Sequence, residues 1–302
     1  MTVAITGGTG FVGQAVLDVM AEKGIPVRAL ARTVPTDRNE VEWIAGSLSD
    51  RDALGSLTKG VDVVIHIAGL TNTPDPAQFE IANVTGTAAL IDATKAADIK
   101  RFIFVSSLSA RKPDLSAYGA SKLAAEKLVE ASGLEWTIVR PPGVYGPRDV
   151  DYLDMFKAAR LGVVPLPPGG ASSMIHVDDL ASLLIALVSP SPKIRRKVFE
   201  PDDGREGGWS HKEMAAAIGD AFGRRVLAPH LPKSVLLGAA KIDRLIRRDK
   251  AKLTADRVGY MCHPNWVSRS DRAIPPEVWM PAIATPEGLK STVDWYRQKG
   301  WL

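Results

Sequence analysis

The chain has 302 residues, 45% apolar and 24% charged, which is typical of a globular protein with one large core and a smaller lobe. The net charge of +4 is small and the basic residues are dispersed, so we expect no nucleic-acid partner. Cys262 is the single cysteine, which excludes an internal disulfide, and the five histidines lack ligand spacing, so we expect no metal. With no leader-like segment and no run of about 20 apolar residues, we predict a cytoplasmic protein.

Strand and helix patterns alternate over the first 140 residues. Apolar, β-branched runs predict strands, and apolar residues at helical spacing predict helices. The strands are expected at 2–6, 26–31, 41–45, 61–67, 101–106 and 136–139, and the helices at 11–23, 50–57, 79–97 and 116–132. Because the strands are apolar throughout, both sheet faces should be covered by helices. The pattern predicts an α/β fold with a doubly wound parallel sheet, the Rossmann architecture.

After Arg140 prolines interrupt this rhythm, and five of the seven tryptophans fall in the last third of the chain. We therefore expect a Rossmann domain of residues 1–142, to which about 175–200 return. Residues 143–174 and 201–302 should form a smaller, irregular α/β lobe that binds substrate. This lobe should lie over the carboxyl edge of the sheet, where open α/β sheets bind ligands.

The stretch 235–248 in this lobe combines apolar residues at helical spacing with Arg247 and Arg248 at its end. A basic amphipathic helix of this kind can lie on a membrane surface. We expect instead that it covers the substrate site or packs as a core helix. Membrane contact is therefore not expected.

A glycine-rich loop, Thr6-Gly7-Gly8-Thr9-Gly10-Phe11-Val12-Gly13, joins the first strand to the first helix. Glycines there permit a tight turn and a close approach of the backbone to a pyrophosphate, while the helix N-terminus directs N–H groups at the phosphates. The strand before and the helix after give the motif its required context. The sequence therefore predicts a dinucleotide cofactor.

The end of the second strand bears on which dinucleotide is bound. NAD-preferring proteins usually carry an acidic residue there, for the ribose 2′-hydroxyl. This chain has Arg28 and Arg32 and no acid before Asp37. Because the planar fork of Arg32 suits a 2′-phosphate, we expect NADP(H) to be preferred, with NAD(H) as the alternative.

Tyr118 and Lys122 lie four residues apart, near the start of a predicted helix, and therefore share a helix face. An ammonium near a phenol favours the phenolate and lowers the tyrosine pKa, so Tyr118 can serve as general acid in reduction or base in oxidation. Ser106 and Ser107 end the fifth strand, at the ligand-binding edge of the sheet. A hydroxyl there can orient a substrate oxygen toward Tyr118.

These motifs together resemble the extended short-chain dehydrogenases/reductases, a superfamily that includes nucleotide-sugar epimerases and dehydratases. Further landmarks are His66-Ile67-Ala68-Gly69, Asn83-Val84-Thr85-Gly86-Thr87, Arg140-Pro141-Pro142-Gly143-Val144-Tyr145-Gly146-Pro147 and His176-Val177-Asp178-Asp179. The resemblance implies catalytic roles for Ser107, Tyr118 and Lys122. It implies cofactor contacts, which also include Tyr118 and Lys122, at Gly7, Gly10, Phe11, Val12, Arg32, Ala68, Gly69, Asn83, Pro142 and Val144.

Two departures from the family pattern matter for function. The family often has Gly-Asp after the third strand, where this chain has Gly46-Ser47-Leu48, so we expect Ser47 and Leu48 on the adenine side with a weakened or serine-replaced contact. The loop from Ser107 to Tyr118 is short, whereas sugar-nucleotide epimerases often carry a longer one. This disfavours a standard epimerase of UDP-sugars.

We therefore predict an NADP(H)-dependent oxidoreductase that interconverts a secondary alcohol and a ketone in a small-molecule substrate. The alternatives are a nucleotide-sugar epimerase or dehydratase with tightly bound NAD(P), and a non-catalytic nucleotide-binding structural subunit. The intact Ser107, Tyr118 and Lys122 argue against the last. A homodimer is compatible with the sequence.

Overall fold

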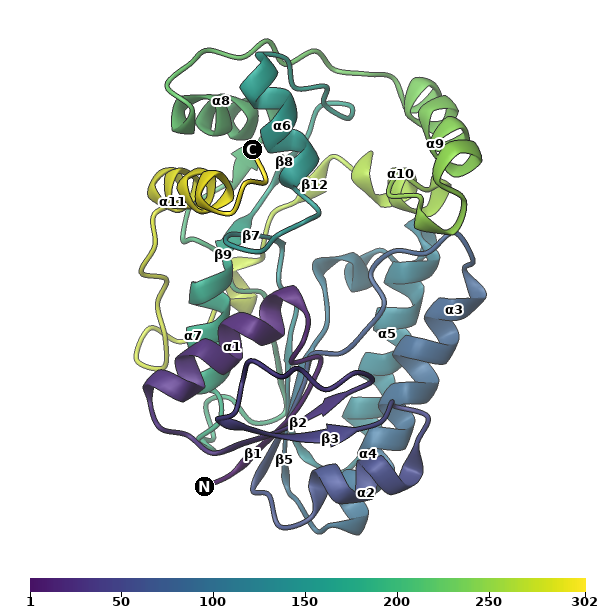
Figure 1. Ribbon diagram of the computed structural model, residues 1–302, viewed down its shortest axis with the longest axis vertical. Coiled ribbons are helices and arrows are strands. Elements are labelled where there is room, and N and C mark those ends of the chain that lie inside the picture. The colour runs from purple at the N-terminus through teal and green to yellow at the C-terminus, as the bar shows by residue number, and fades with distance from the viewer.

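The computed structural model describes residues 1–302, apart from the side chain of Lys250, and is built around a seven-stranded sheet (Figure 1). The strand order is β10-β6-β5-β4-β1-β2-β3, and every neighbouring pair is parallel. The strands are β1 (Val3–Thr6), β2 (Val27–Ala31), β3 (Val41–Ala45), β4 (Val63–His66), β5 (Arg101–Val105), β6 (Glu135–Val139) and β10 (Lys197–Phe199). The predicted doubly wound parallel sheet is confirmed.

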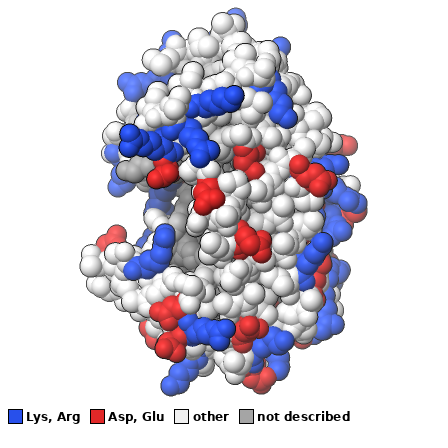
Figure 2. All heavy atoms as spheres, turned by 90° about the vertical axis from the view of Figure 1, so that its right-hand side faces the viewer, with Lys and Arg blue, Asp and Glu red and all other residues white. Residues whose placement is uncertain are grey.

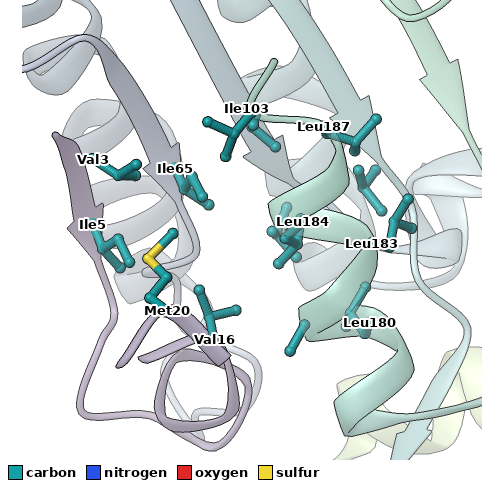
Figure 3. Packing of buried hydrophobic residues seen from close by; sticks show 14 of the residues in the cluster. Val3, Ile5, Val16, Met20, Ile65, Ile103, Leu180, Leu183, Leu184 and Leu187 are labelled. Atoms are coloured by element: carbon teal, nitrogen blue, oxygen red, sulfur yellow. The ribbon is translucent and has the colours of Figure 1, made fainter. Parts of the chain in front are cut away.

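Helices cover both faces of this sheet. On one face lie α1 (Phe11–Glu22) and α7 (Val177–Ala186), and on the other lie α2 (Arg51–Thr58), α4 (Gly86–Ala96) and α5 (Ala117–Ala131). Successive residues of β1 point to opposite faces, so Val3 and Ile5 pack with α1 and α7 whereas Ala4 packs with α2 and its neighbours. Figure 3 shows the first of these cores, where side chains of α1 and α7 meet those of the strands.

The helix expected at 79–97 is not one continuous α-helix. It consists of α3 (Ala77–Phe79), a π-helical turn (Glu80–Thr85) and then α4. The Thr87 hydroxyl, at the start of α4, donates to the carbonyl of Asn83 in the π-helical turn at 2.6 Å. Such π-bulges are rare, and they often mark functional sites.

The smaller lobe lies above the carboxyl edge of the sheet (Figure 1). It contains a three-stranded sheet of β11 (Trp209–Ser210), β8 (Ala171–Ser172) and β12 (Asn265–Trp266), and a two-stranded sheet of β7 (Gly143–Tyr145) and β9 (Met174–His176). Its helices are α6 (Leu153–Leu161), α8 (His211–Ala221), α9 (Lys233–Arg247), α10 (Ala255–Met261) and α11 (Thr285–Gln298). Short 3-10 helices span Leu108–Arg111, Pro113–Leu115, Arg248–Lys250 and Ser270–Arg272.

The segment 175–200 divides between the two parts. Strand β10 extends the main sheet beside β6, and α7 packs on α1. Strand β9, however, pairs with β7 and not with the main sheet. The division into residues 1–142 with about 175–200, and 143–174 with 201–302, remains a prediction.

Helix α9 differs from the expectation of a core helix. Leu236 and Ala240 are buried, but four other apolar side chains of α9 are exposed to solvent. Periodicity identified the helix correctly, yet it does not say whether a second apolar face is covered. No helix among the described residues has both the length and the apolar character needed to cross a membrane.

Candidate active site

The glycine-rich loop forms a close turn at the carboxyl end of β1. Gly7 has φ +79°, in the left-handed region that favours glycine, and a Cβ there would lie 2.6 Å from the amide nitrogen of Ala68. A Cβ on Gly13 would lie 2.0 Å from the carbonyl oxygen of Gly7. The N-cap of α1 is Gly10, which supplies no side-chain hydrogen bond, and the first turn holds no acidic residue.

The free N–H groups at the start of α1 therefore adjoin a turn made mostly of glycines. Phe11 and Val12 are the first residues of this helix, and their N–H groups have no intrahelical acceptor. With the positive end of the helix dipole, they suit the pyrophosphate of a dinucleotide. The loop thus fits the cofactor that the sequence predicts.

The two arginines of the second strand differ in their surroundings. The Arg28 guanidinium donates to the carbonyls of Ser56 and Lys59 and pairs with Glu42 at 2.9 Å, so it ties β2 to its neighbours. Arg32 follows the last residue of β2 and is exposed, and among the described side chains it has no ion-pair partner. Arg32 is therefore free to meet a 2′-phosphate.

Ser47 and Leu48 form the turn after β3. The Ser47 hydroxyl lies 2.8 Å from that of Ser49 and also accepts from the Ser49 N–H. Leu48 packs against Gly86, where an added Cβ would lie 2.9 Å from the leucine side chain. The leucine therefore packs between two elements, and its role toward the cofactor remains a prediction.

Polar side chains hold the segment that contains Ala68 and Gly69. The Asn83 amide group donates to the carbonyl of Leu70 and to the Ser121 hydroxyl, both at 2.9 Å, and its oxygen accepts from the Leu70 N–H at 2.7 Å. Since its donors and acceptor are engaged, Asn83 positions this segment beside α5.

His66 belongs to the same part of the sheet edge. Its ring nitrogens lie 2.6 Å from the Thr6 hydroxyl and 2.9 Å from that of Thr87. Burial, assisted by the charge of Lys122, lowers the pKa of His66 to about 3, so its ring is neutral. His66 therefore links β1 to α4 as a structural group.

The three predicted catalytic residues meet at the carboxyl end of β5. Ser107 follows this strand, while Tyr118 and Lys122 lie in the first two turns of α5. The Ser107 hydroxyl caps the following 3-10 helix by accepting from the Ser109 N–H at 3.2 Å, and it is within hydrogen-bonding reach of the Tyr118 phenol. The helix places the tyrosine and the lysine one turn apart, as their spacing predicts.

The sequence predicts that the Lys122 ammonium lowers the pKa of Tyr118, but in the ligand-free protein this pKa is raised. Burial raises it well above its usual range, and the hydrogen bond from Ser107 works against this rise. The charged groups that act on it are Asp151 and Arg257, with Tyr260, all from the lobe. The phenol is therefore protonated at neutral pH, as a proton donor must be.

Lys122 is directed toward the strand instead of the phenol. Its ammonium donates to the carbonyl of Val105 at 2.7 Å and lies 4.5 Å from the centre of the Phe104 ring. Burial lowers the pKa of Lys122 to about 8, while Glu126 opposes the shift. A Cβ on Gly69 would lie 3.6 Å from this nitrogen, so the ammonium also borders the segment held by Asn83.

The lobe contributes residues that the sequence analysis missed. Asp256 of α10 accepts hydrogen bonds from the N–H groups of Ala117 and Tyr118, at 2.5 and 3.4 Å, and so caps α5. The ring centre of Tyr260 lies 6.2 Å from that of Tyr118. These residues carry no motif, and their sequence distance from Tyr118 hid the contact.

Pro142 and Val144 lie at the junction of sheet and lobe. Both are half-buried, and Val144 in β7 is paired with Ile175 in β9. A Cβ on the intervening Gly143 would lie 2.3 Å from the phenol oxygen of Tyr152, so that tyrosine packs closely on the strip. The expected contact of this strip with a nicotinamide remains a prediction.

A buried ion-pair network lies beside Ser107, the predicted catalytic serine. The Ser106 hydroxyl donates to Glu126, whose carboxylate accepts two hydrogen bonds from Arg140 at 2.9 and 2.6 Å. Arg140 also reaches Glu200 at 3.5 Å, and Glu200 pairs with Arg111 at 3.0 Å. Four segments far apart in the chain are thereby fixed around the end of β5.

Comparisons with known proteins bear on the family and the cofactor of this chain. The model of the family described as NAD(P)H-binding matches residues 7–189. The ceramide reductase of Caulobacter vibrioides is 36% identical over 310 residues, which cover 99% of this chain and 96% of the relative. The 4-hydroxy-2-methyl-3-oxo-4-farnesyl-3,4-dihydroquinoline-1-oxide ketoreductase of Stigmatella aurantiaca is 33% identical over 219 residues, covering 64% of this chain and 66% of the relative.

Solved structures share the fold over the whole length of the chain. MoeE5 in complex with UDP-glucose and NAD covers 99% of this chain and 99% of its own, with a TM-score of 0.77. Its sequence identity is 22%, so this likeness shows the fold alone.

Proposed function

The chain belongs to the NAD(P)H-binding family and to the extended short-chain dehydrogenases/reductases, and on that premise we propose that it reduces a ketone to a secondary alcohol. The observation that carries the proposal is the meeting of Ser107, Tyr118 and Lys122 at the carboxyl end of β5. The protein is an NAD(P)-dependent oxidoreductase. The direction and the functional group are our proposal.

The chemistry divides between the cofactor and the side chains. When bound, a dihydronicotinamide would supply the hydride for the carbonyl carbon. The Tyr118 phenol, protonated in its buried setting, gives its proton to the carbonyl oxygen. The Ser107 hydroxyl orients that oxygen, and the Lys122 ammonium would hold the nicotinamide ribose.

We favour NADP(H) as the cofactor. The support is Arg32, exposed at the end of β2 and free of ion pairs among the described side chains, where an acidic residue would mark NAD(H) use. A guanidinium can accommodate a 2′-phosphate through its planar donor fork. NAD(H) remains the alternative cofactor.

For the substrate we propose a long-chain lipid of the ceramide class carrying a ketone. This follows from the ceramide reductase that is 36% identical over almost the whole of both chains. The second relative acts on a farnesyl-bearing ketone by its name, so both names describe reductases of molecules with long apolar parts. The aromatic side chain of Tyr260 beside Tyr118 gives such a molecule an apolar surface.

The test is an assay of ketone reduction that follows the absorbance of NADPH. Ketones of ceramide-class lipids dispersed in detergent are compared with nucleotide sugars, with wild-type protein and with Tyr118→Phe. We expect turnover of the lipid ketone, and a loss of about 10²–10⁴ in rate for the variant because the proton donor is gone. Turnover of nucleotide sugars alone, with a cofactor that is never released, would favour the epimerase alternative. Full activity of Tyr118→Phe would refute the assignment of the proton donor.

A further inference from the structure

The outward side of α9 carries an unpartnered apolar surface. Val235, Ile242, Leu245 and Ile246, which we call the outer stripe, are exposed by 49%, 59%, 79% and 75%. Ile242 lies seven residues after Val235, and Leu245 and Ile246 lie three and four residues after Ile242, which places all four along one side of the helix. The inner side is already occupied, since Leu236 and Ala240 pack against Val258 of α10. The side chains of the outer stripe therefore do not contribute to the packed core of the lobe.

Positive charge accompanies the outer stripe. The segment 233–248 contains five basic residues and one acidic residue, a net charge of +4 that equals the formal charge of the whole chain. The single acid, Asp243, pairs with Arg247 at 3.1 Å and accepts hydrogen bonds from two backbone N–H groups. Among the described side chains, Lys241 and Arg244 have no carboxylate partner. In Figure 2 the upper lobe shows blue side chains among white ones, and red is scarce there.

We propose that α9 docks on an anionic lipid bilayer. A 15-residue helix with an apolar stripe and basic flanks suits the boundary between headgroups and acyl chains. The stripe would enter the apolar side of that boundary, while Lys241 and Arg244 would meet the lipid phosphates. A protein partner or a second copy would not need this concentration of one charge sign.

Docking in this way would bring the bilayer close to the active site. Helix α10 packs on the inner side of α9 through Val258, and it carries Tyr260, whose ring lies 6.2 Å from that of Tyr118. One helix therefore separates the docked surface from the proton donor. The functional reason for this docking rests on the proposed lipid substrate, because a ceramide-class ketone would reside in the bilayer.

The test is flotation of the full chain with vesicles of phosphatidylcholine, with and without phosphatidylglycerol. We expect binding to the anionic vesicles that weakens as salt rises. The double change Leu245→Ser with Ile246→Ser, and the double change Lys241→Glu with Arg244→Glu, should each lower the bound-to-free ratio by about tenfold or more. The matched control is Leu161→Ser on α6, a leucine exposed by 82%, which should bind like wild type.

The outcomes separate docking from catalysis, because flotation needs no turnover. Wild-type protein that stays unbound from anionic vesicles, or outer-stripe variants that bind as well as wild type, would overturn the proposal. The proposal would also be overturned if wild-type protein did not bind vesicles and instead formed a dimer that the outer-stripe variant could not form. Vesicle binding without reduction of any ketone would support docking and contradict only the proposed function. All variants should keep wild-type turnover of a water-soluble ketone.

Discussion

Lys122 combines two requirements that conflict. In the proposed function its ammonium stays charged to hold a cofactor ribose, yet burial beside Phe104 lowers its pKa from 10.5 to about 8. The hydrogen bond to the Val105 carbonyl and the charge of Glu126 offset only part of this burial. Catalytic groups are often held in settings that destabilise the fold.

We predict that Lys122→Met raises the free energy of unfolding of the ligand-free protein at pH 7, by about 1–3 kcal/mol, while it weakens cofactor binding. In wild type the folded lysine is neutral and the unfolded one charged between pH 8 and 10.5, so unfolding takes up a proton and stability rises with pH. The variant should lose that rise. Denaturant unfolding across this pH range measures the difference between the two proteins, and identical pH profiles would contradict the burial argument.

Arg32 gives the second prediction at this scale. Arg32→Ala should weaken NADP(H) binding by roughly 10- to 100-fold, because a charged hydrogen bond to the phosphate contributes about 1.5–3 kcal/mol. Affinity for NAD(H), which lacks this phosphate, should stay unchanged and serves as the internal control. Titration of both cofactors into both proteins decides the matter. A preference for NADP(H) that survives the change would assign the phosphate to another residue.

Among the elements, α5 matters most to the site, because it carries both Tyr118 and Lys122 in its first turns. Its N-terminus is capped twice. The Ser116 hydroxyl accepts from the Gly119 N–H at 3.0 Å, and the Asp256 carboxylate of the lobe accepts from the N–H groups of Ala117 and Tyr118. The second cap comes from α10, so the lobe helps to set the position of α5.

We predict that Asp256→Ala lowers the free energy of unfolding by about 0.5–2 kcal/mol, the usual effect of losing a cap. It should also lower kcat, since Tyr118 lies in the turn that loses its acceptor. Asp256→Asn keeps one acceptor oxygen and should recover part of both. The control is Glu130→Ala, an exposed carboxylate at the other end of α5. An Asp256→Ala protein with wild-type kcat would show that α5 needs no support from the lobe.

Across the whole molecule, the buried network of Glu126, Arg140 and Glu200 joins the sheet to the lobe. Arg140 follows β6 and Glu200 follows β10. Glu200 also accepts from the Arg269 N–H at 3.1 Å. Both carboxylates are buried, and both pair with the Arg140 guanidinium. A buried ion pair is weak evidence of added stability, but breaking one is costly.

We predict that Arg140→Met lowers the free energy of unfolding by about 3–5 kcal/mol, since Glu126 would be left buried without its partner. The added change Glu126→Gln should recover part of this loss by removing the orphaned charge. Lys193→Met, which breaks an exposed pair with Glu277, should cost less than about 1 kcal/mol. Thermal and denaturant unfolding of the four proteins test this, and an Arg140→Met protein as stable as Lys193→Met would contradict it.

The sequence alone determined the Rossmann sheet, its covering helices and the places of Gly7, Ser107, Tyr118 and Lys122 along it. These features follow from local patterns, because the spacing of apolar residues and glycines dictates strand, turn and helix within a few residues. The same local spacing predicted that Tyr118 and Lys122 share a face of α5.

Only the tertiary structure decided what surrounds them. The approach of Asp256 and Tyr260 to Tyr118 joins residues well over a hundred positions apart, and such contacts depend on packing between elements. The pKa of Tyr118 likewise follows from burial under the lobe, which no local pattern encodes. The helical periodicity of α9 marked its apolar residues, but only the fold showed that one side covers α10 and the other faces outward. A sequence pattern records which faces are apolar, whereas tertiary packing determines which of them find a partner.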